Sequence, residues 1–278
     1  LGDYELAVKL GQNGKRIIKE KFNLKQNTRN LLSIYEQVLS KRHVGIINQP
    51  AAELPVKHIE SLPVLNQRLV MKTCEMKKPA VYNYPNAMTL AITTRCNMTP
   101  PCVMCTRNIN PPEWENECED KILDKVKRIF PYLDILYLHC NGEPLYSNNF
   151  EEILKIVKPP TKIRFNSNGL LLDERMAHLI IDSRVVDVIN FSIDASSPET
   201  YKKIRGGDFH RVIKNIMRLS KVIRKKKADY FTIVVNMCLM KENIREVPAF
   251  IELAKRIDAK GVDIFHLNEG MNWRCERK

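Results

Sequence analysis

The chain has 278 residues, 44% of them hydrophobic, which is enough for one large domain with its own core and an appendage. No apolar run approaches the ~20 residues that a membrane-spanning helix needs, so we expect no membrane span. The net charge is +13, but the basic residues are spread along the chain. The densest basic run, residues 221–227, ends a helical pattern, where cations suit the helix dipole. We therefore predict a solvated helix end and no nucleic-acid partner.

The eight cysteines follow no apolar stretch of the secretory type, which predicts reduced thiols and a cytoplasmic location. Cys140 and Cys238 lie in strand-like runs and are expected to be buried. Cys275 lies beyond the last predicted strand, where a longer protein would have room for further metal ligands. Because Leu1 enters a helical pattern directly and no closing element precedes the last residue, we expect the chain to be a piece of a longer protein.

Residues 1–42 show apolar residues at helical spacing and are predicted to form a helical segment. The segment is similar to the C-terminal tail of retaining glycosyltransferases with two Rossmann-like lobes (GT-B, family 4-like). The matching residues are Leu10, Gly11, Asn13, Gly14, Lys21, Phe22, Tyr35 and Glu36. The resemblance implies a glycosyltransferase fusion. The alternative is a helical pair that packs on the main domain.

Residues 43–86 contain five prolines and no sustained period, which predicts a Pro-containing linker or irregular packing. From residue 87 to 278, strand and helix patterns alternate six times, which predicts parallel strands joined by helices. The strands are expected at 88–94, 135–140, 162–166, 188–193, 230–238 and 262–266. The helices are expected at 117–129, 149–157, 173–182, from 198, 208–224 and 243–257. The fold class is therefore α/β, a partial (β/α)6 TIM-like barrel with an N-terminal helical appendage.

Three cysteines follow the first predicted strand: Cys96, Cys102 and Cys105. A structural zinc site takes four ligands, whereas a cubane iron–sulfur cluster held by three thiolates leaves one iron open. The loop that follows a strand at its carboxyl end is also where active sites of such folds lie. A zinc site completed by His139 or His266 and three unrelated structural cysteines are the alternatives.

The stretch from Thr93 to Cys105 resembles the radical S-adenosylmethionine (SAM) enzymes, in which three cysteines follow a strand ending in Thr-Thr-X-Cys-Asn. Their first two cysteines are separated by three residues, and here Cys96 and Cys102 are separated by five. The second spacing, from Cys102 to Cys105, agrees with the family. The resemblance implies a [4Fe-4S] cluster bound by these cysteines and SAM bound to its open iron.

Polar motifs follow the later strands. Asn141 replaces the first glycine of the family's Gly-Gly-Glu-Pro motif, and the resemblance implies that Gly142, Glu143 and Pro144 bind the amino group of SAM; a simple turn is the alternative. Residues 166–169 are equally consistent with a polar turn and a ligand contact.

Ser192 and Asp194 end the fourth strand, where alternation would point both to one face, and the family has its ribose and carboxylate contacts there. Asn236, at the end of the fifth strand, is a further cofactor-binding candidate, and His266 and Asn268 could face cofactor or substrate. Residues 199–209 are similar to the family branch with extra C-terminal clusters (SPASM/Twitch). Arg205 could pair with the carboxylate of SAM or be structural.

The resemblance implies an enzyme that cleaves SAM reductively to a 5′-deoxyadenosyl radical, which abstracts hydrogen from a peptide, sugar or other metabolite. It also implies a reductant such as flavodoxin or ferredoxin. The rival from another class is a zinc-stabilised α/β binding module without radical chemistry. A second rival is a basic enzyme that modifies RNA with the same cofactor, against which the scattered charge argues.

Overall fold

The computed structural model describes residues 61–75, 83–108, 115–139 and 141–266. The chain divides into two compact units, Leu1–Ile59 and Glu60–Lys278, and all described residues lie in the second. The helical segment predicted at 1–42, Cys140, Asn268 and Cys275 lie outside the described residues.

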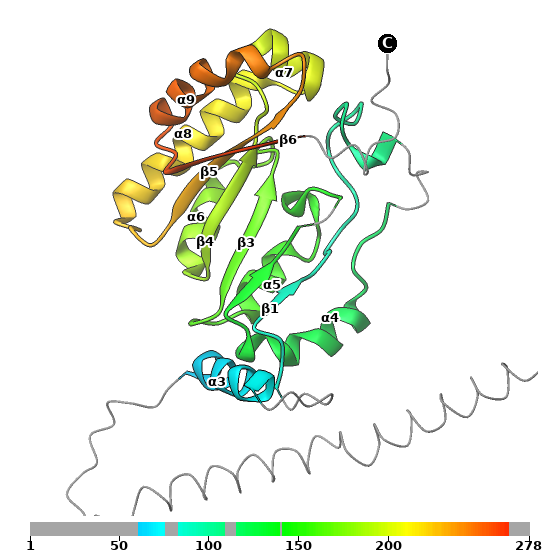
Figure 1. Cartoon of the computed structure of the whole chain (residues 1–278), viewed down its shortest axis with the longest axis vertical. Coiled ribbons are helices and arrows are strands. Elements are labelled where there is room, and N and C mark those ends of the chain that lie inside the picture. The colour runs from blue at the N-terminus through cyan, green and yellow to red at the C-terminus, as the bar shows by residue number, and fades with distance from the viewer. Residues whose placement is uncertain (1–60, 76–82, 109–114, 140, 267–278) are drawn as a thin grey trace, which may run out of the picture. The chain divides into compact units, whose positions relative to one another are not determined.

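The described part is built on one parallel six-stranded sheet whose strands follow in chain order. The strands are β1 (Ala87–Thr89), β2 (Ile135–Tyr137), β3 (Lys162–Ser167), β4 (Val186–Ser192), β5 (Thr232–Leu239) and β6 (Gly261–His266). Each pairs in parallel with the next, and the helices between them lie along the sheet (Figure 1). A parallel sheet in sequential order with intervening helices is the predicted partial (β/α)6 barrel, so the α/β fold class is confirmed.

The helices that connect the strands lie close to their predicted positions, except that α4 and α9 begin later than predicted. They are α4 (Asp120–Val126) with the 3₁₀ turn η4 (Lys127–Tyr132), α5 (Phe150–Ile156), α6 (Glu174–Ser183), α7 (Pro198–Ile204), α8 (Phe209–Lys226) and α9 (Val247–Arg256). Short 3₁₀ turns lie at η2 (Thr106–Asn108), η5 (Pro144–Tyr146) and η6 (Ile244–Glu246). Asp173, Ser197 and Asp208 cap α6, α7 and α8 by accepting a hydrogen bond from a backbone N–H in the first turn. Among the described residues, no helix has the length and apolar character needed to cross a bilayer.

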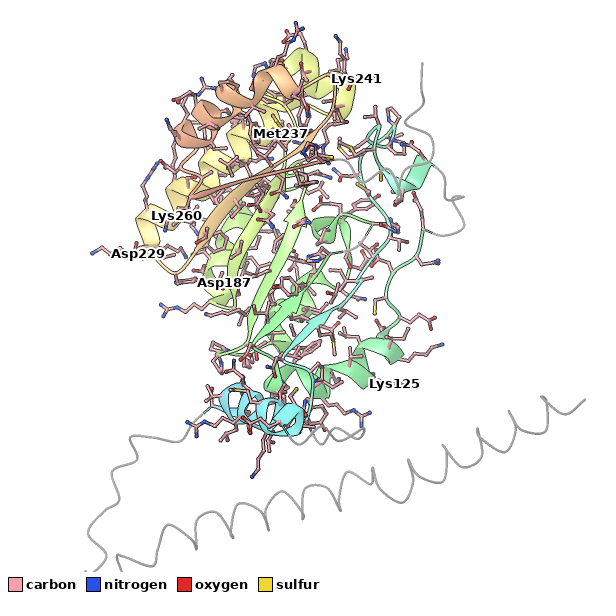
Figure 2. All side chains as sticks on the ribbon, in the orientation of Figure 1. Lys125, Asp187, Asp229, Met237, Lys241 and Lys260 are labelled. Atoms are coloured by element: carbon pink, nitrogen blue, oxygen red, sulfur yellow. The ribbon has the colours of Figure 1, made fainter. Side chains whose placement is uncertain are left out.

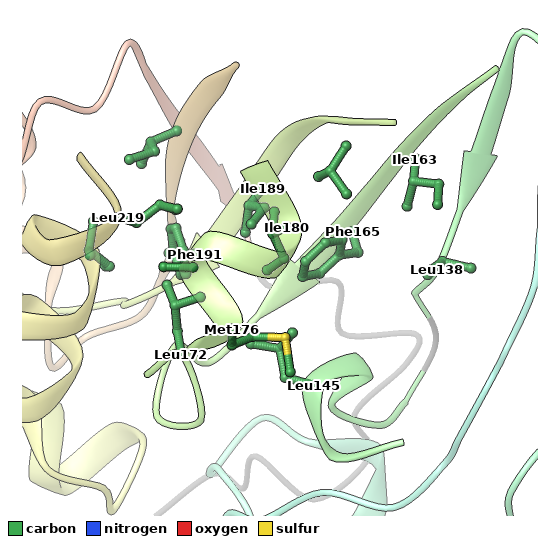
Figure 3. Close-up of a cluster of buried hydrophobic side chains, with 14 of the residues drawn as sticks. Leu138, Leu145, Ile163, Phe165, Leu172, Met176, Ile180, Ile189, Phe191 and Leu219 are labelled. Atoms are coloured by element: carbon green, nitrogen blue, oxygen red, sulfur yellow. The ribbon is translucent and has the colours of Figure 1, made fainter. Parts of the chain in front are cut away.

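The hydrophobic core lies between the sheet and the helices. Phe165 of β3 and Phe191 of β4 point toward Ile180 of α6 and Leu219 of α8 (Figure 3). Figure 2 shows the periphery, where exposed lysines such as Lys125 lie, whereas Met237 is fully buried.

The other face of the sheet is polar at its centre. Successive residues of a strand point to opposite faces, so Asn166, Asn190 and Asn236 lie on the face away from Phe165 and Phe191. A closed barrel fills this space with branched apolar side chains. The asparagines instead make this face suited to a polar ligand.

Strand β1 is shorter than predicted. Its ladder with β2 covers only Ala87–Thr89, and residues 92–94 turn to a different partner. Thr94 N–H donates to Asn116 O and Cys118 N–H donates to Ile92 O. The prediction of a helix from 117 was therefore wrong at its start: residues 116–118 pair with 92–94, and α4 begins only at Asp120.

The prediction of irregular structure throughout residues 43–86 was also wrong, because α3 (Leu62–Glu75) lies within it. Pro63 occupies the first turn of α3, where a missing N–H costs no hydrogen bond, so this proline begins a helix instead of ending one. Asn66, 3% exposed, donates from Nδ2 to Tyr84 O and Tyr132 O and accepts from Tyr84 N–H. These bonds attach α3 to the chain entering β1 and to η4.

Candidate active site

The cysteine loop, residues 96–105, follows β1 at the carboxyl end of the sheet. Cys102 is 6% exposed, and Cys96 and Cys105 are half-buried. Val103 N–H donates to Ile204 O at 3.0 Å, which fixes the loop against the end of α7. Asn108 Nδ2 donates to Cys102 O at 2.8 Å and steadies the turn between the second and third cysteines.

The loop brings the three thiols together without arranging them as ligands. Cys102 interacts electrostatically with both Cys96 and Cys105. Within the part of the chain that the structure describes, no three Cys, His, Asp or Glu side chains form a ready metal site. Neither His139 nor His266 therefore joins two of the cysteines in a zinc-like group.

Two of the three sulfurs accept a hydrogen bond from a side chain. Arg205 Nη1 donates to Cys102 Sγ at 3.5 Å, and Asn168 Nδ2 donates to Cys96 Sγ at 3.7 Å. Arg107 is close enough to favour the thiolate of Cys96. Burial outweighs these effects and raises the pKa of Cys96 to about 11 and that of Cys105 above its ordinary value. A metal bound here must therefore displace protons from the thiols.

The motif from Gly142 to Pro144 lies against the start of the cysteine loop. A Cβ on Gly142 would meet Thr93 O at 2.4 Å and Arg95 O at 2.7 Å, so no other residue fits without moving the backbone. Glu143 N–H donates to Arg95 O at 2.8 Å. The glycine is thus required for the close approach of two loops, those after β1 and after β2.

The carboxylate of Glu143 organises the third loop. The residue is 2% exposed, and its carboxylate accepts hydrogen bonds from Ser167 Oγ, Asn168 N–H and Leu145 N–H. Burial raises the pKa of Glu143 to about 6, although these donors oppose the shift. Asn168 also donates to Asn97 Oδ1 at 2.8 Å, which links the loop after β3 to the cysteine loop. Residues 166–169 are therefore more than a polar turn, since they hold Glu143 and reach Cys96.

Asp194 lies after β4, which ends at Ser192. The predicted alternation of Ser192 and Asp194 was wrong, because Asp194 has a left-handed backbone with φ +59° and is not in the strand. The Asp194 side chain is 1% exposed, and its carboxylate accepts from Arg205 Nε at 2.6 Å and from Cys238 N–H at 2.7 Å. Burial lowers the pKa of Arg205, but its neighbours Asp194 and Cys102 together raise it by more. The pKa of Arg205 therefore lies above the ordinary value.

The remaining predicted residues lie side by side across β4 and β5. Ser192 is the register partner of Asn236, which is 7% exposed. Oδ1 of Asn236 and Oδ1 of the neighbouring Asn190 are buried without a hydrogen-bond partner among the described residues. Nδ1 of His139 is also buried without a partner there, and burial lowers its pKa. Unsatisfied buried acceptors are uncommon, and these two asparagines lie on the polar face of the sheet.

The chain belongs to the radical SAM superfamily, whose sequence model matches residues 90–254. The enzymes of this family use a [4Fe-4S] cluster and SAM. A probable GTP 3′,8-cyclase of Methanosarcina acetivorans is 29% identical over 192 residues, covering 66% of this chain and 54% of that protein. An AdoMet-dependent heme synthase of Methanosarcina barkeri is 28% identical over 195 residues, covering 68% of this chain and 52% of that protein. The chain thus spans about half the length of these curated relatives.

Solved structures share the fold. SuiB of Streptococcus suis bound to S-adenosylmethionine aligns with a TM-score of 0.56 at 13% identity, covering 73% of this chain and 45% of SuiB. The structure of anSMEcpe with bound AdoMet aligns with a TM-score of 0.51 at 17% identity, covering 66% of this chain and 49% of that protein. At such identities, the likeness concerns the fold alone.

The residues at this end of the sheet fit the family's cofactors. Three thiols on one loop are the donor set of a cluster with an open iron, and two of them already accept hydrogen bonds from side chains. Oδ1 of Asn236, which has no hydrogen-bond partner among the described residues, fits a polar ligand at this end of the sheet. Sequence reasoning did not single out Arg107, because its position near Cys96 depends on how the cysteine loop folds.

Proposed function

We propose that this chain binds a [4Fe-4S] cluster through Cys96, Cys102 and Cys105 and cleaves SAM reductively. The observation that carries the proposal is the convergence of three loops, those after β1, β2 and β3, through Gly142, Glu143 and Asn168. A reduced cluster bound there would supply the electron that cleaves SAM to methionine and a 5′-deoxyadenosyl radical, which would take a hydrogen atom from the substrate.

The protein's own groups position these partners. The backbone edge of Gly142 to Pro144, fixed by Glu143 N–H to Arg95 O, supplies carbonyl acceptors for an ammonium group. Ser192 and Asn236 supply polar contacts on the inner face. Oδ1 of Asn236 has no hydrogen-bond partner within the described part of the chain, which supports this assignment.

Asp194 has a different role from Ser192 and Asn236. Both of its carboxylate oxygens are engaged, by Arg205 and by Cys238 N–H, so we assign it the positioning of Arg205 against Cys102. A direct ribose contact by Asp194 stays a prediction, as does a contact between Arg205 and the carboxylate of SAM.

The substrate class we propose is a peptide, sugar or other metabolite. The similarity of residues 199–209 to the SPASM/Twitch branch supports it, and so do relatives named as GTP 3′,8-cyclases and heme synthase. A flavodoxin or ferredoxin would supply the electron, in a cytoplasm. The similarity of residues 1–42 to a glycosyltransferase tail supports a fusion with such an enzyme.

Anaerobic reconstitution with iron and sulfide tests the proposal. We expect a [4Fe-4S] absorbance band and an electron paramagnetic resonance signal that shifts when SAM is added. The band should be lost in Cys102→Ala and kept in Cys118→Ala, a matched control because Cys118 is also a free thiol but lies outside the loop. A colourless protein with stoichiometric zinc would support the zinc-stabilised module instead.

A further inference from the structure

A basic groove lies between α8 and α9. Neither helix contributes a residue to the cysteine loop. Its volume is about 580 Å³, within the range of binding pockets. Helices α8 and α9 run next to each other on the side of the sheet that carries the core (Figure 1). The groove is lined by Phe209, His210, Ile213, Lys214, Met217, Arg218, Lys221, Leu253, Arg256 and Ile257.

The groove has an apolar floor and a basic rim. Leu253 and Ile257 are buried at its base, while Met217 is 43% exposed and offers an apolar surface to an occupant. The rim carries His210, Lys214, Arg218, Lys221 and Arg256, and no carboxylate is among the lining residues.

The cations of the rim have no carboxylate partner among the described residues. Within the described residues, Lys214, Lys221 and Arg256 make no hydrogen bond or ion pair. Outside the groove, three cations on the same two helices do have carboxylate partners: Arg224 pairs with Asp258, Lys226 with Asp182 and Lys255 with Glu252.

The rim also places like charges next to each other. Lys214 and Arg218 are four residues apart on α8, and Arg218 and Lys221 are three apart, so each pair repels. An anionic occupant would relieve this repulsion and supply the missing partners of Lys214 and Lys221.

We propose that the basic groove binds an acidic amphipathic helix of a partner protein. From Phe209 to Lys221 the groove follows about 18 Å of helix α8, the length of three turns. An apolar groove of this length between helices takes the apolar face of a helix, and carboxylates on its flanks would meet the rim. The groove is separate from the proposed SAM site, so neither proposal depends on the other.

The shape argues against other anionic partners. Leu253 and Ile257 of the groove are 2% and 1% exposed, so a flat bilayer surface cannot reach them, whereas a membrane-binding helix presents its apolar face outward. Single-stranded RNA stacks its bases on exposed aromatic rings, and Phe209, the one phenylalanine, tyrosine or tryptophan among the lining residues, is 8% exposed.

The probe is a fluorescent synthetic helix of 18 residues with leucines on one face and glutamates on the flanks, compared with a scrambled peptide of the same composition. We expect saturable binding by anisotropy, with amide-exchange protection confined to 209–221 and 253–257. Lys214→Glu/Lys221→Glu should weaken binding at least tenfold. The control of equal charge is Lys155→Glu/Lys158→Glu, with Lys155 in the last turn of α5 and Lys158 just after this helix. Because both groove substitutions place glutamate near Arg218, α8 should remain folded, which circular dichroism checks.

Met217→Ser separates apolar docking from simple charge attraction, since it leaves the charge unchanged. We expect severalfold weaker binding of the amphipathic peptide. Absence of binding, equal binding of the scrambled peptide, an equal loss in the α5 control, or full affinity in Met217→Ser would each overturn the proposal. Groove protection by vesicles of anionic phospholipid or by single-stranded RNA, without protection by the peptide, would overturn it in favour of those partners.

Discussion

The pair formed by Asp194 and Arg205 supports a prediction that requires no cofactor. The two side chains are 1% and 14% exposed, and Arg205 connects Asp194 with the sulfur of Cys102. Removing one partner of a buried ion pair leaves the other charge uncompensated, at a cost of about 3–5 kcal/mol. Asp194→Asn is the suitable substitution, because asparagine tolerates the left-handed φ of +59° and can still accept from Cys238 N–H. We expect Asp194→Asn and Arg205→Met each to lower the free energy of unfolding by that amount.

The double variant is the stricter test. With both charges gone, neither is left unpaired, so Asp194→Asn/Arg205→Met should cost about 2 kcal/mol less than the sum of the single variants. Anaerobic urea unfolding followed by circular dichroism measures all four proteins. Additive losses would show that the two side chains do not stabilise each other, and the positioning role of Asp194 would then fail.

Three further predictions concern the loops around the site. Gly142→Ala should lower stability by about 1–3 kcal/mol, because the new Cβ meets backbone oxygens of Thr93 and Arg95; an unchanged urea midpoint would contradict this packing. Asn236→Ala should leave the stability of the SAM-free protein within about 0.5 kcal/mol, because Oδ1 has no hydrogen-bond partner among the residues that the structure describes. The same substitution should weaken SAM binding, measured by calorimetry, about tenfold; equal SAM affinity would remove Asn236 from the site. Since burial raises the pKa of Glu143 from 4.5 to about 6, its contribution to stability is present below pH 4.5 and lost as the pH rises through 6. Urea unfolding at several pH values should show a loss of about 2 kcal/mol over this window that is absent in Glu143→Gln, and an identical pH dependence in both proteins would refute it.

The sequence indicated the fold well wherever the signal is local. Strands β3 to β6 lie within two residues of their predicted bounds at every end, because period-two patterns and flanking turns identify strands. The start of α4 and the end of β1 could not be read in the same way. Their bounds depend on hydrogen bonds between residues 92–94 and 116–118, and pairing at that separation leaves no periodic signal.

The site residues also divide into those that local sequence identifies and those that depend on contacts between distant residues. The cysteines and the residues 142–144 could be found by spacing and motif, since each is contiguous in sequence. The hydrogen bond from Arg205 to Asp194 could not be found in this way. It depends on the left-handed backbone of Asp194 after β4, which the alternation rule does not anticipate. Helix α3 was missed for a related reason: a proline count cannot distinguish a proline in a loop from Pro63 in the first turn of a helix.

The measurement that tests the central claim most directly is the release of 5′-deoxyadenosine from SAM by the reconstituted protein under dithionite, followed by chromatography. The account predicts release by the natural sequence and by Cys118→Ala, and none by Cys96→Ala, Cys102→Ala or Cys105→Ala. Release that survives the loss of any of the three loop cysteines, or no release by a protein shown to carry the cluster and to bind SAM, would contradict it.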